Sequence, residues 1–155
     1  MRAKVGMAKE EESGMSAIMG IDPGLTGAIG ILHVDGSVAV EDMPRNPRDL
    51  YGLLREWRCR AFVEQAQAMP KQGVSSTFKT GYGYGLIIGV LAGLGIPYQT
   101  VTPAVWKRAM GLWGKDKEAS RALARSLWPE APLGRKMDHG RAEALLLAEY
   151  GRRQP

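Results

Sequence analysis

Short apolar runs separated by turn residues open the sequence. A buried strand is predicted at residues 16–21, and the Asp-Pro-Gly turn at residues 22–24 ends it. Further strands are predicted at 27–34 and 37–43, and the Asp35-Gly36 pair between them is a strong hairpin signal. The pattern therefore predicts three antiparallel strands that follow one another as a meander.

The hydrophobic period then changes to that of helices. Leucines recur at helical spacing within residues 47–60, with Asn46 as a candidate cap, and residues 61–64 follow as a strand. A strand–helix–strand unit predicts that this strand pairs in parallel with the first one. A fifth strand is predicted at 96–101, and further helices at 75–92, 103–110, 117–128 and 139–150, the last one ended by Gly151. The fold class is therefore expected to be α/β, with a five-stranded mixed sheet and helices on both faces.

Length and composition limit the architecture. The chain has 155 residues, of which 45% are hydrophobic and 24% charged, and these values are typical of one globular domain. The domain is expected at residues 16–155, after a flexible tail at 1–15, and its length excludes a two-lobed enzyme. The net charge of +5 favours an anionic partner, with nucleic acid ahead of a membrane surface.

The single cysteine and the apolar runs limit the cellular setting. Cys59 is the only cysteine in the sequence, so an intrachain disulfide and a multi-cysteine zinc site are excluded. It is expected to be a small core residue. Residues 1–15 lack the apolar stretch of a secretory signal. The longest apolar run, residues 86–94, is about half of the roughly 20 residues that a membrane span requires. A cytoplasmic protein without a membrane partner is expected.

Two carboxylates follow strands that are predicted to lie side by side. Asp22 ends the first strand and Glu64 ends the fourth. Parallel strands bring their carboxyl ends to one edge of the sheet, where open α/β sheets place their sites. Two carboxylates at that edge repel each other unless a cation lies between them. Taken singly, Asp22 could equally be a turn residue and Glu64 a solvated side chain.

The last predicted helix adds further candidate ligands. His139 and Glu143 lie four residues apart and share one helix face, and both can bind a divalent metal. Asp138 stands at the predicted cap, where a carboxylate is favoured without any role in a site, and it remains an alternative to His139. With Asp22 and Glu64, these groups suit two Mg²⁺ or Mn²⁺ ions about 4 Å apart, an arrangement that hydrolyses phosphodiesters.

Four short motifs, taken in order, resemble those of RuvC-type Holliday junction resolvases, which have a ribonuclease H-like fold. They lie at residues 18–24, 62–65, 102–118 and 139–147, and their order and spacing agree across residues 16–150. The last motif is more similar to bacteriophage-encoded resolvases than to the cellular enzyme. The resemblance implies a metal-dependent endodeoxyribonuclease that acts as a homodimer on four-way DNA junctions and makes paired symmetric nicks.

The resemblance also implies roles for particular side chains. Asp22, Glu64, His139 and Glu143 would bind the metal, while Lys107 and Lys117 would stabilise charge at the scissile phosphate. The cellular enzyme has an aromatic wedge after the second acidic motif, where this chain has Gln67. Other residues around the motifs are expected to contact DNA, as phosphate ligands or by stacking on bases: Lys71, Phe78, Lys79, Tyr82, Lys107, Arg108, Lys115, Arg135, Lys136 and Arg141.

Four glycines recur on the helix predicted at 75–92 and just beyond it, at positions 81, 85, 89 and 93. Each costs about 1 kcal/mol of helix propensity relative to alanine, so a close approach of another backbone must offset the cost. Either this helix packs tightly on the sheet, or the stripe is the contact of the homodimer that the resemblance implies. Trp106 and Trp113 are expected to lie in the core.

Other function classes stay open at the level of the sequence. One is a ribonuclease H-like nuclease that acts on other branched or RNA-containing substrates. Another is a non-catalytic junction-binding protein. Residues 20–27 also resemble the phosphate loop of actin-like sugar kinases, but those need a second lobe that 155 residues cannot hold.

Overall fold

The first three strands form the predicted antiparallel meander. β1 (Ala17–Asp22), β2 (Ala28–His33) and β3 (Val38–Asp42) pair in chain order. The turn between β2 and β3 contains Gly36 with a φ of +86°, a left-handed conformation that favours glycine. The computed structural model describes residues 17–155, so the tail expected at 1–15 lies outside the described residues.

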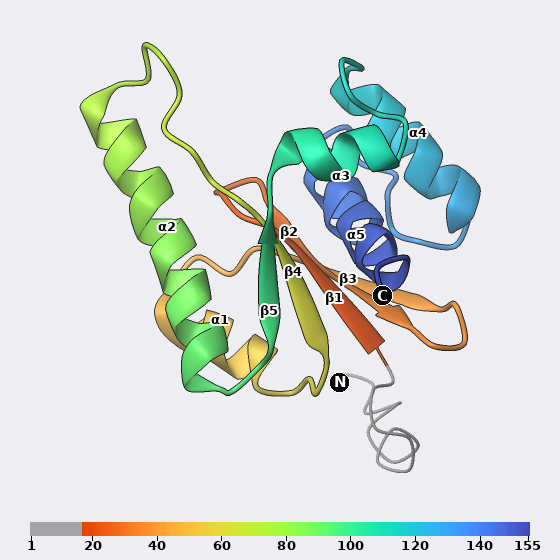
Figure 1. Cartoon of the computed structure of the whole chain (residues 1–155), viewed down its shortest axis with the longest axis horizontal. Coiled ribbons are helices and arrows are strands. Elements are labelled where there is room, and N and C mark those ends of the chain that lie inside the picture. The colour runs from red at the N-terminus through yellow and green to blue at the C-terminus, as the bar shows by residue number, and fades with distance from the viewer. Residues whose placement is uncertain (1–16) are drawn as a thin grey trace.

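Helix–strand units extend the sheet in parallel. β4 (Arg60–Glu64) pairs with β1 and β5 (Tyr98–Val101) pairs with β4, which gives the strand order β3-β2-β1-β4-β5. Figure 1 shows this mixed sheet with its helices, which confirms the predicted topology. The helices are α1 (Pro47–Leu54), α2 (Val74–Gly93), α3 (Pro103–Ala109), α4 (Lys117–Leu127) and α5 (His139–Arg152).

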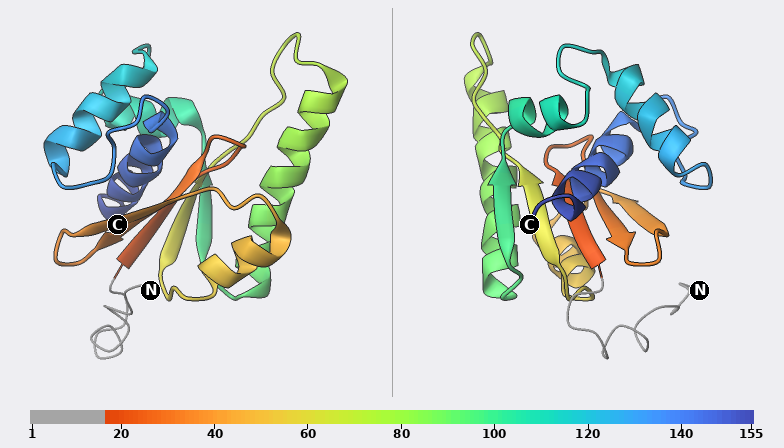
Figure 2. Two further views of the ribbon diagram at one scale, coloured as in Figure 1. Left: turned by 180° about the vertical axis from the view of Figure 1, so that it is seen from behind. Right: turned by 45° about the vertical axis from the view of Figure 1, so that its right-hand side comes forward.

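Alternation along the strands divides the core into two layers. Met19 and Ile21 of β1 pack with Leu54 of α1 and Leu91 of α2. Phe62 of β4 belongs to a second cluster, together with the buried side chains of α3, α4 and α5. The turned views in Figure 2 show α1 and α2 against one face of the sheet and α5 against the other. The prediction of helices on both faces is confirmed.

The backbone of α5 lies directly on β1 and β2. An added Cβ at Gly20 would overlap the carbonyl oxygen of Ala144, and one at Gly30 would lie 2.9 Å from the amide nitrogen of Leu145. Glycine is therefore required where the helix crosses these strands. The close contact fixes the height of Glu143, which precedes Ala144, above the sheet.

Two helix ends differ from the sequence prediction. Asn46 caps α1 as expected. The helix ends at Leu54 rather than Arg60, because the chain must turn after the helix to enter β4 at Arg60. Cys59, just before this strand, is already buried. Helix α5 continues through Gly151 to Arg152. Gly151 is not a left-handed cap; its missing side chain leaves room for the ring of Phe62.

Helix α2 turns its glycine stripe outward. Gly81, Gly85, Gly89 and Gly93 are exposed, and nothing lies within 4 Å of a Cβ added at any of them. The alternative in which the stripe packs on the sheet is therefore wrong, since other side chains of α2 make that contact. None of the helices within residues 17–155 combines the length and apolarity needed to cross a membrane.

Both ends of the described chain lie at the same edge of the sheet. Ile18, near the start of β1, pairs with Arg60 at the start of β4. The guanidinium of Arg60 donates hydrogen bonds to the carbonyl oxygens of Gly151, at 3.4 Å, and Pro155, at 3.5 Å. Asp22 lies at the opposite edge, where β1 ends.

Replacing Gly20 with alanine is predicted to destabilise the domain, because the new methyl group overlaps the α5 backbone. We expect a loss of about 3 kcal/mol in the free energy of unfolding, measured by urea denaturation. Gly52→Ala in α1 is the matched control, since its added Cβ meets open space. That variant is expected to gain about 1 kcal/mol through helix propensity. Equal effects of the two substitutions would contradict the close packing of α5 on β1.

Candidate active site

Asp22 and Glu64 are the last residues of neighbouring parallel strands. The register pairs Ile21 with Val63, so the two carboxylates follow one residue later on adjacent strands. Glu64 comes two residues after Phe62, whose ring lies in the cluster with α5. Because side chains alternate along a strand, the carboxylates of β1 and β4 turn to this same face.

Glu143 brings a third carboxylate to this edge from α5. It is buried, and its Oε1 lies 3.2 Å from the Nζ of Lys107 in α3. The same oxygen accepts a hydrogen bond of 3.3 Å from the hydroxyl of Ser120 in α4. Glu143 interacts electrostatically with both Asp22 and Glu64. Three carboxylates from three elements therefore lie near enough to influence one another electrostatically.

Helix α3 contacts two of these carboxylates from adjacent positions. The indole nitrogen of Trp106 donates a hydrogen bond of 2.7 Å to Oε2 of Glu64. Trp106 is fully buried, and Lys107, the next residue, forms the ion pair with Glu143. The ammonium group of Lys107 also lies 5.4 Å from the centre of the Trp106 ring.

Burial and neighbouring negative charges disfavour ionisation of Asp22 and Glu64. Burial raises the pKa of Asp22 well above its usual value, and the charges of Glu64 and Glu143 raise it further, while Lys107 and Lys117 oppose the change. Burial also raises the pKa of Glu64, although the hydrogen bond from Trp106 acts in the opposite direction. A cation at this edge would stabilise the charged forms of both groups.

The chemistry of these donors suits a hard divalent cation. Mg²⁺ is commonly held by one or two carboxylates together with waters and substrate phosphates, and Asp22 with Glu64 meets that requirement. Within residues 17–155, no three side chains of His, Cys, Asp or Glu form a group that could hold a metal ion by themselves. Asp22 and Glu64 fit such a cation, with water and substrate oxygens as its further ligands.

The structure distinguishes the two candidate ligands at the start of α5. Asp138 is buried, and its carboxylate accepts hydrogen bonds from the backbone nitrogen of Arg135, at 2.6 Å, and from its guanidinium, at 2.7 Å. Arg141 lies 3.7 Å from the same carboxylate. His139, the next residue, is half-buried. The carboxylate of Asp138 is therefore already engaged by Arg135 and Arg141.

The candidate DNA-binding residues lie on two sides of the carboxylates. Figure 1 shows α2 and the loop before it on one side of the sheet, and α3 and α4 on the other. Phe78 and Tyr82 of α2 are 73% and 60% exposed. The basic side chains of both sides are exposed as well: Lys71, Lys79, Arg108, Lys115, Lys117 and Lys136.

Two of the candidate arginines are engaged within the protein. Asp42, at the end of β3, lies 2.9 Å from the guanidinium of Arg135 and 2.7 Å from that of Arg141. The side chain of Arg141 is only 18% exposed. Both arginines therefore join the end of β3 to the segment around Asp138.

Several side chains around the site do not follow from the sequence pattern. Ser120 is a small residue within α4, and no local signal connects it with Glu143. Trp106 lies in the core as expected, but its packing alone did not reveal the hydrogen bond to Glu64. The prediction that Trp113 lies in the core is wrong: it is 52% exposed and stacks on Arg108, in a loop that turns at two left-handed glycines.

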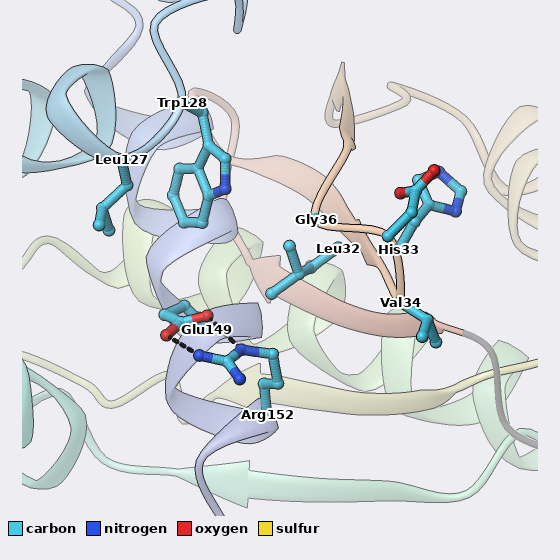
Figure 3. A pocket seen from close by; sticks show the side chains of 9 residues that line it. Leu32, His33, Val34, Gly36, Leu127, Trp128, Glu149 and Arg152 are labelled. Atoms are coloured by element: carbon cyan, nitrogen blue, oxygen red, sulfur yellow. Dashed lines mark hydrogen bonds and ion pairs between the residues drawn. The ribbon is translucent and has the colours of Figure 1, made fainter.

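A pocket of about 340 Å³ lies at the edge of the sheet away from Asp22 (Figure 3). It is lined by residues 32–36 of the β2–β3 hairpin and by Leu127, Trp128, Glu149 and Arg152. The Glu149 carboxylate pairs there with Arg152 at 2.7 Å. None of the predicted site residues lines this pocket, so the pocket is separate from Asp22, Glu64 and Glu143.

Comparison with solved structures defines the class of fold. RuvC from Thermus thermophilus is similar over 86% of this chain and 92% of its own, with a TM-score of 0.61 and 22% sequence identity. The T. thermophilus RuvC in complex with Holliday junction substrate is similar over 87% of this chain and 91% of its own, with a TM-score of 0.62 and 20% identity. The chain therefore has the α/β, ribonuclease H-like fold of RuvC, as its sequence indicated.

One particular relative is also similar in sequence. The Holliday junction resolvase MOC1, a chloroplastic protein of Chlamydomonas reinhardtii, is 38% identical to this chain over 133 residues. The match covers 77% of this chain and 14% of that relative's length. No protein-family model matches the chain. The predicted resemblance to RuvC-type resolvases is thus confirmed by the fold and by this relative.

Asp22→Asn is predicted to stabilise the metal-free protein at neutral pH, because it removes a half-buried charge that Glu64 and Glu143 repel. The pKa of Asp22 is raised in the folded state, so its ionisation with rising pH destabilises the fold. We expect a gain of about 0.5–2 kcal/mol in the free energy of unfolding at neutral pH. The gain should vanish in acid, where the aspartate is protonated in both states.

Urea denaturation in the presence of a chelator measures this effect. Asp35→Asn in the hairpin turn is the control, since hydrogen bonds from Ser37 lower the pKa of Asp35. Ionisation therefore favours the fold at that position, and its removal should lower stability at neutral pH. An Asp22→Asn variant that is less stable than wild type at neutral pH would show that the three carboxylates do not repel one another as described.

Proposed function

We propose that the chain is a metal-dependent endonuclease that resolves four-way DNA junctions. The observation that carries the proposal is the meeting of Asp22, Glu64 and Glu143 with Lys107 at one edge of a RuvC-like sheet. The algal relative is named a Holliday junction resolvase, and one of the similar RuvC structures is a complex with a junction. Both support the same substrate for this chain.

The proposed chemistry is phosphodiester hydrolysis with two divalent ions, Mg²⁺ or Mn²⁺. When bound, such ions activate a water molecule and stabilise the leaving oxygen. Asp22 and Glu64 would hold the cations at the strand ends, and Glu143 and His139 would complete the ligand set from α5. Lys107 and Lys117 would stabilise the negative charge that develops at the scissile phosphate.

The exposed basic and aromatic residues would bind the arms of the junction. Lysines on both sides of the carboxylates can contact phosphates, which makes binding sensitive to salt. Phe78 and Tyr82 can stack on unpaired bases near the crossover. Arg135 and Arg141 would contribute mainly by holding the segment before α5, since Asp42 already pairs with both.

A homodimer is part of the proposal, because paired symmetric nicks require two identical sites. The outward glycine stripe of α2 lets a second helix approach closely, and a two-fold axis would place the same stripe on both partners. Nuclease action on other branched or RNA-containing substrates is the second candidate, since the same carboxylates would serve it. A cytoplasmic location stays a prediction; the algal relative is chloroplastic.

Cleavage of a synthetic four-way junction tests the proposed activity. Wild type is expected to nick the junction, but not a matched duplex, only when Mg²⁺ or Mn²⁺ is present. Asp22→Asn should slow cleavage by at least about 100-fold, because it removes a carboxylate from the cation site. Gel-shift binding to the junction should persist, and Asp35→Asn should cleave like wild type. Undiminished cleavage by Asp22→Asn would refute the assignment of this residue.

Gly85→Leu is predicted to disrupt the homodimer, because the leucine side chain fills the space that a second α2 would occupy. Light scattering after size-exclusion chromatography measures the oligomeric state, and the junction assay measures paired nicking. Ala122→Leu on the exposed face of α4 is the control for added bulk. A Gly85→Leu protein that stayed dimeric and active would exclude the glycine stripe as the interface.

A further inference from the structure

A side-chain hydrogen bond from Trp106 links α3 to the last residue of β4. Its indole N–H donates to Oε2 of Glu64 at 2.7 Å, between residues 42 positions apart in the chain. It is the largest of the fully buried side chains within residues 17–155.

The two partners have unequal hydrogen-bonding capacity. An indole has a single donor and no acceptor, whereas an ionised carboxylate has two acceptor oxygens. The ring of Trp106 is packed in the cluster with Phe62 and Leu145, and this packing fixes the direction in which its N–H points. The hydrogen bond therefore engages Oε2 and leaves Oε1 of Glu64 for another ligand.

The backbone around α3 supports this geometry. Val101, the last residue of β5, pairs with Glu64 itself. Thr102 then caps α3 by accepting a hydrogen bond from the amide of Val105, and Pro103 begins the helix. The strand pairing that fixes the backbone of Glu64 thus also fixes the start of the helix that carries Trp106.

We propose that Trp106 is a positioning residue for the cation: its hydrogen bond to Oε2 holds the Glu64 carboxylate and leaves Oε1 available to a divalent ion. The inference rests on the proposed function, because it requires the site to bind a divalent ion. Partners that orient a ligating carboxylate typically change metal affinity or activity by about 10–100-fold when they are removed. A tryptophan that only filled the core would affect stability and leave metal affinity unchanged.

Trp106→Phe separates these roles, because phenylalanine keeps an aromatic ring and removes the donor. Binding of Mn²⁺ to the DNA-free protein is measured by electron paramagnetic resonance, with thermal unfolding in chelator as the measure of the fold. We expect Trp106→Phe to bind Mn²⁺ about 10-fold more weakly than wild type. Trp128→Phe, at the distant pocket, is the control and should bind like wild type. Wild-type Mn²⁺ affinity in Trp106→Phe would overturn the proposal.

A measurement on the wild-type side chain covers the case in which Trp106→Phe does not fold. The chain has four tryptophans, so nitrogen-15 spectra contain four indole N–H signals. Phenylalanine variants of Trp57, Trp113 and Trp128 assign three of them, and the fourth belongs to Trp106. Titration with Mg²⁺ should shift the Trp106 signal saturably and leave that of Trp128 in place. A Trp106 signal that stays fixed while calorimetry shows Mg²⁺ binding would overturn the role.

The outcomes distinguish this inference from the function on which it rests. If wild type neither binds Mn²⁺ or Mg²⁺ nor cleaves the junction in their presence, the proposed metal-dependent activity fails, and the role of Trp106 fails with it. If wild type binds the ion and cleaves the junction, but Trp106→Phe binds equally well, only the positioning role is overturned.

Discussion

The direct contact between the backbone of α5 and the two central strands determines the geometry of the candidate site. Gly20 lies two residues before Asp22 on β1, and its missing side chain admits the carbonyl of Ala144. Glu143 immediately precedes that carbonyl. The separation between the strand carboxylates and the helix carboxylate is therefore set by main-chain packing, which is stiffer than a contact between long side chains. A bulkier residue at the crossing would move the whole ligand set apart.

This arrangement places like charges together, and the later helices offset the cost. Lys107 and Ser120 contact Glu143, while Trp106 contacts Glu64, so α3 and α4 supply partners for groups that the sheet and α5 bring together. Asp22 has charged neighbours of both signs. The stability of the folded protein is thus reduced at the place where a cation would be bound, as is common where function conflicts with stability.

The sequence predicted the sheet and two of its carboxylates for physical reasons that can be named. Alternating runs and the strand–helix–strand unit determine which strands are parallel, and Asp22 and Glu64 follow because they end such strands. The contacts of Trp106 and Ser120 were not predictable, since their partners lie 42 and 23 residues away. Spacing alone likewise defines a glycine stripe without showing which way it faces. Gly20 did carry a signal, because a glycine within a strand often marks a close backbone approach.

The hydrogen bonds between Arg60 and the last residues of the chain have a practical consequence for experiments on single molecules. They hold residues 151–155 near the start of β1 and β4, and Asp22 lies at the other end of β1. A surface anchor or fluorophore attached near residue 155 would therefore be held roughly one strand length, about 20 Å, from the carboxylates. Such a label would report on the domain without touching the candidate site.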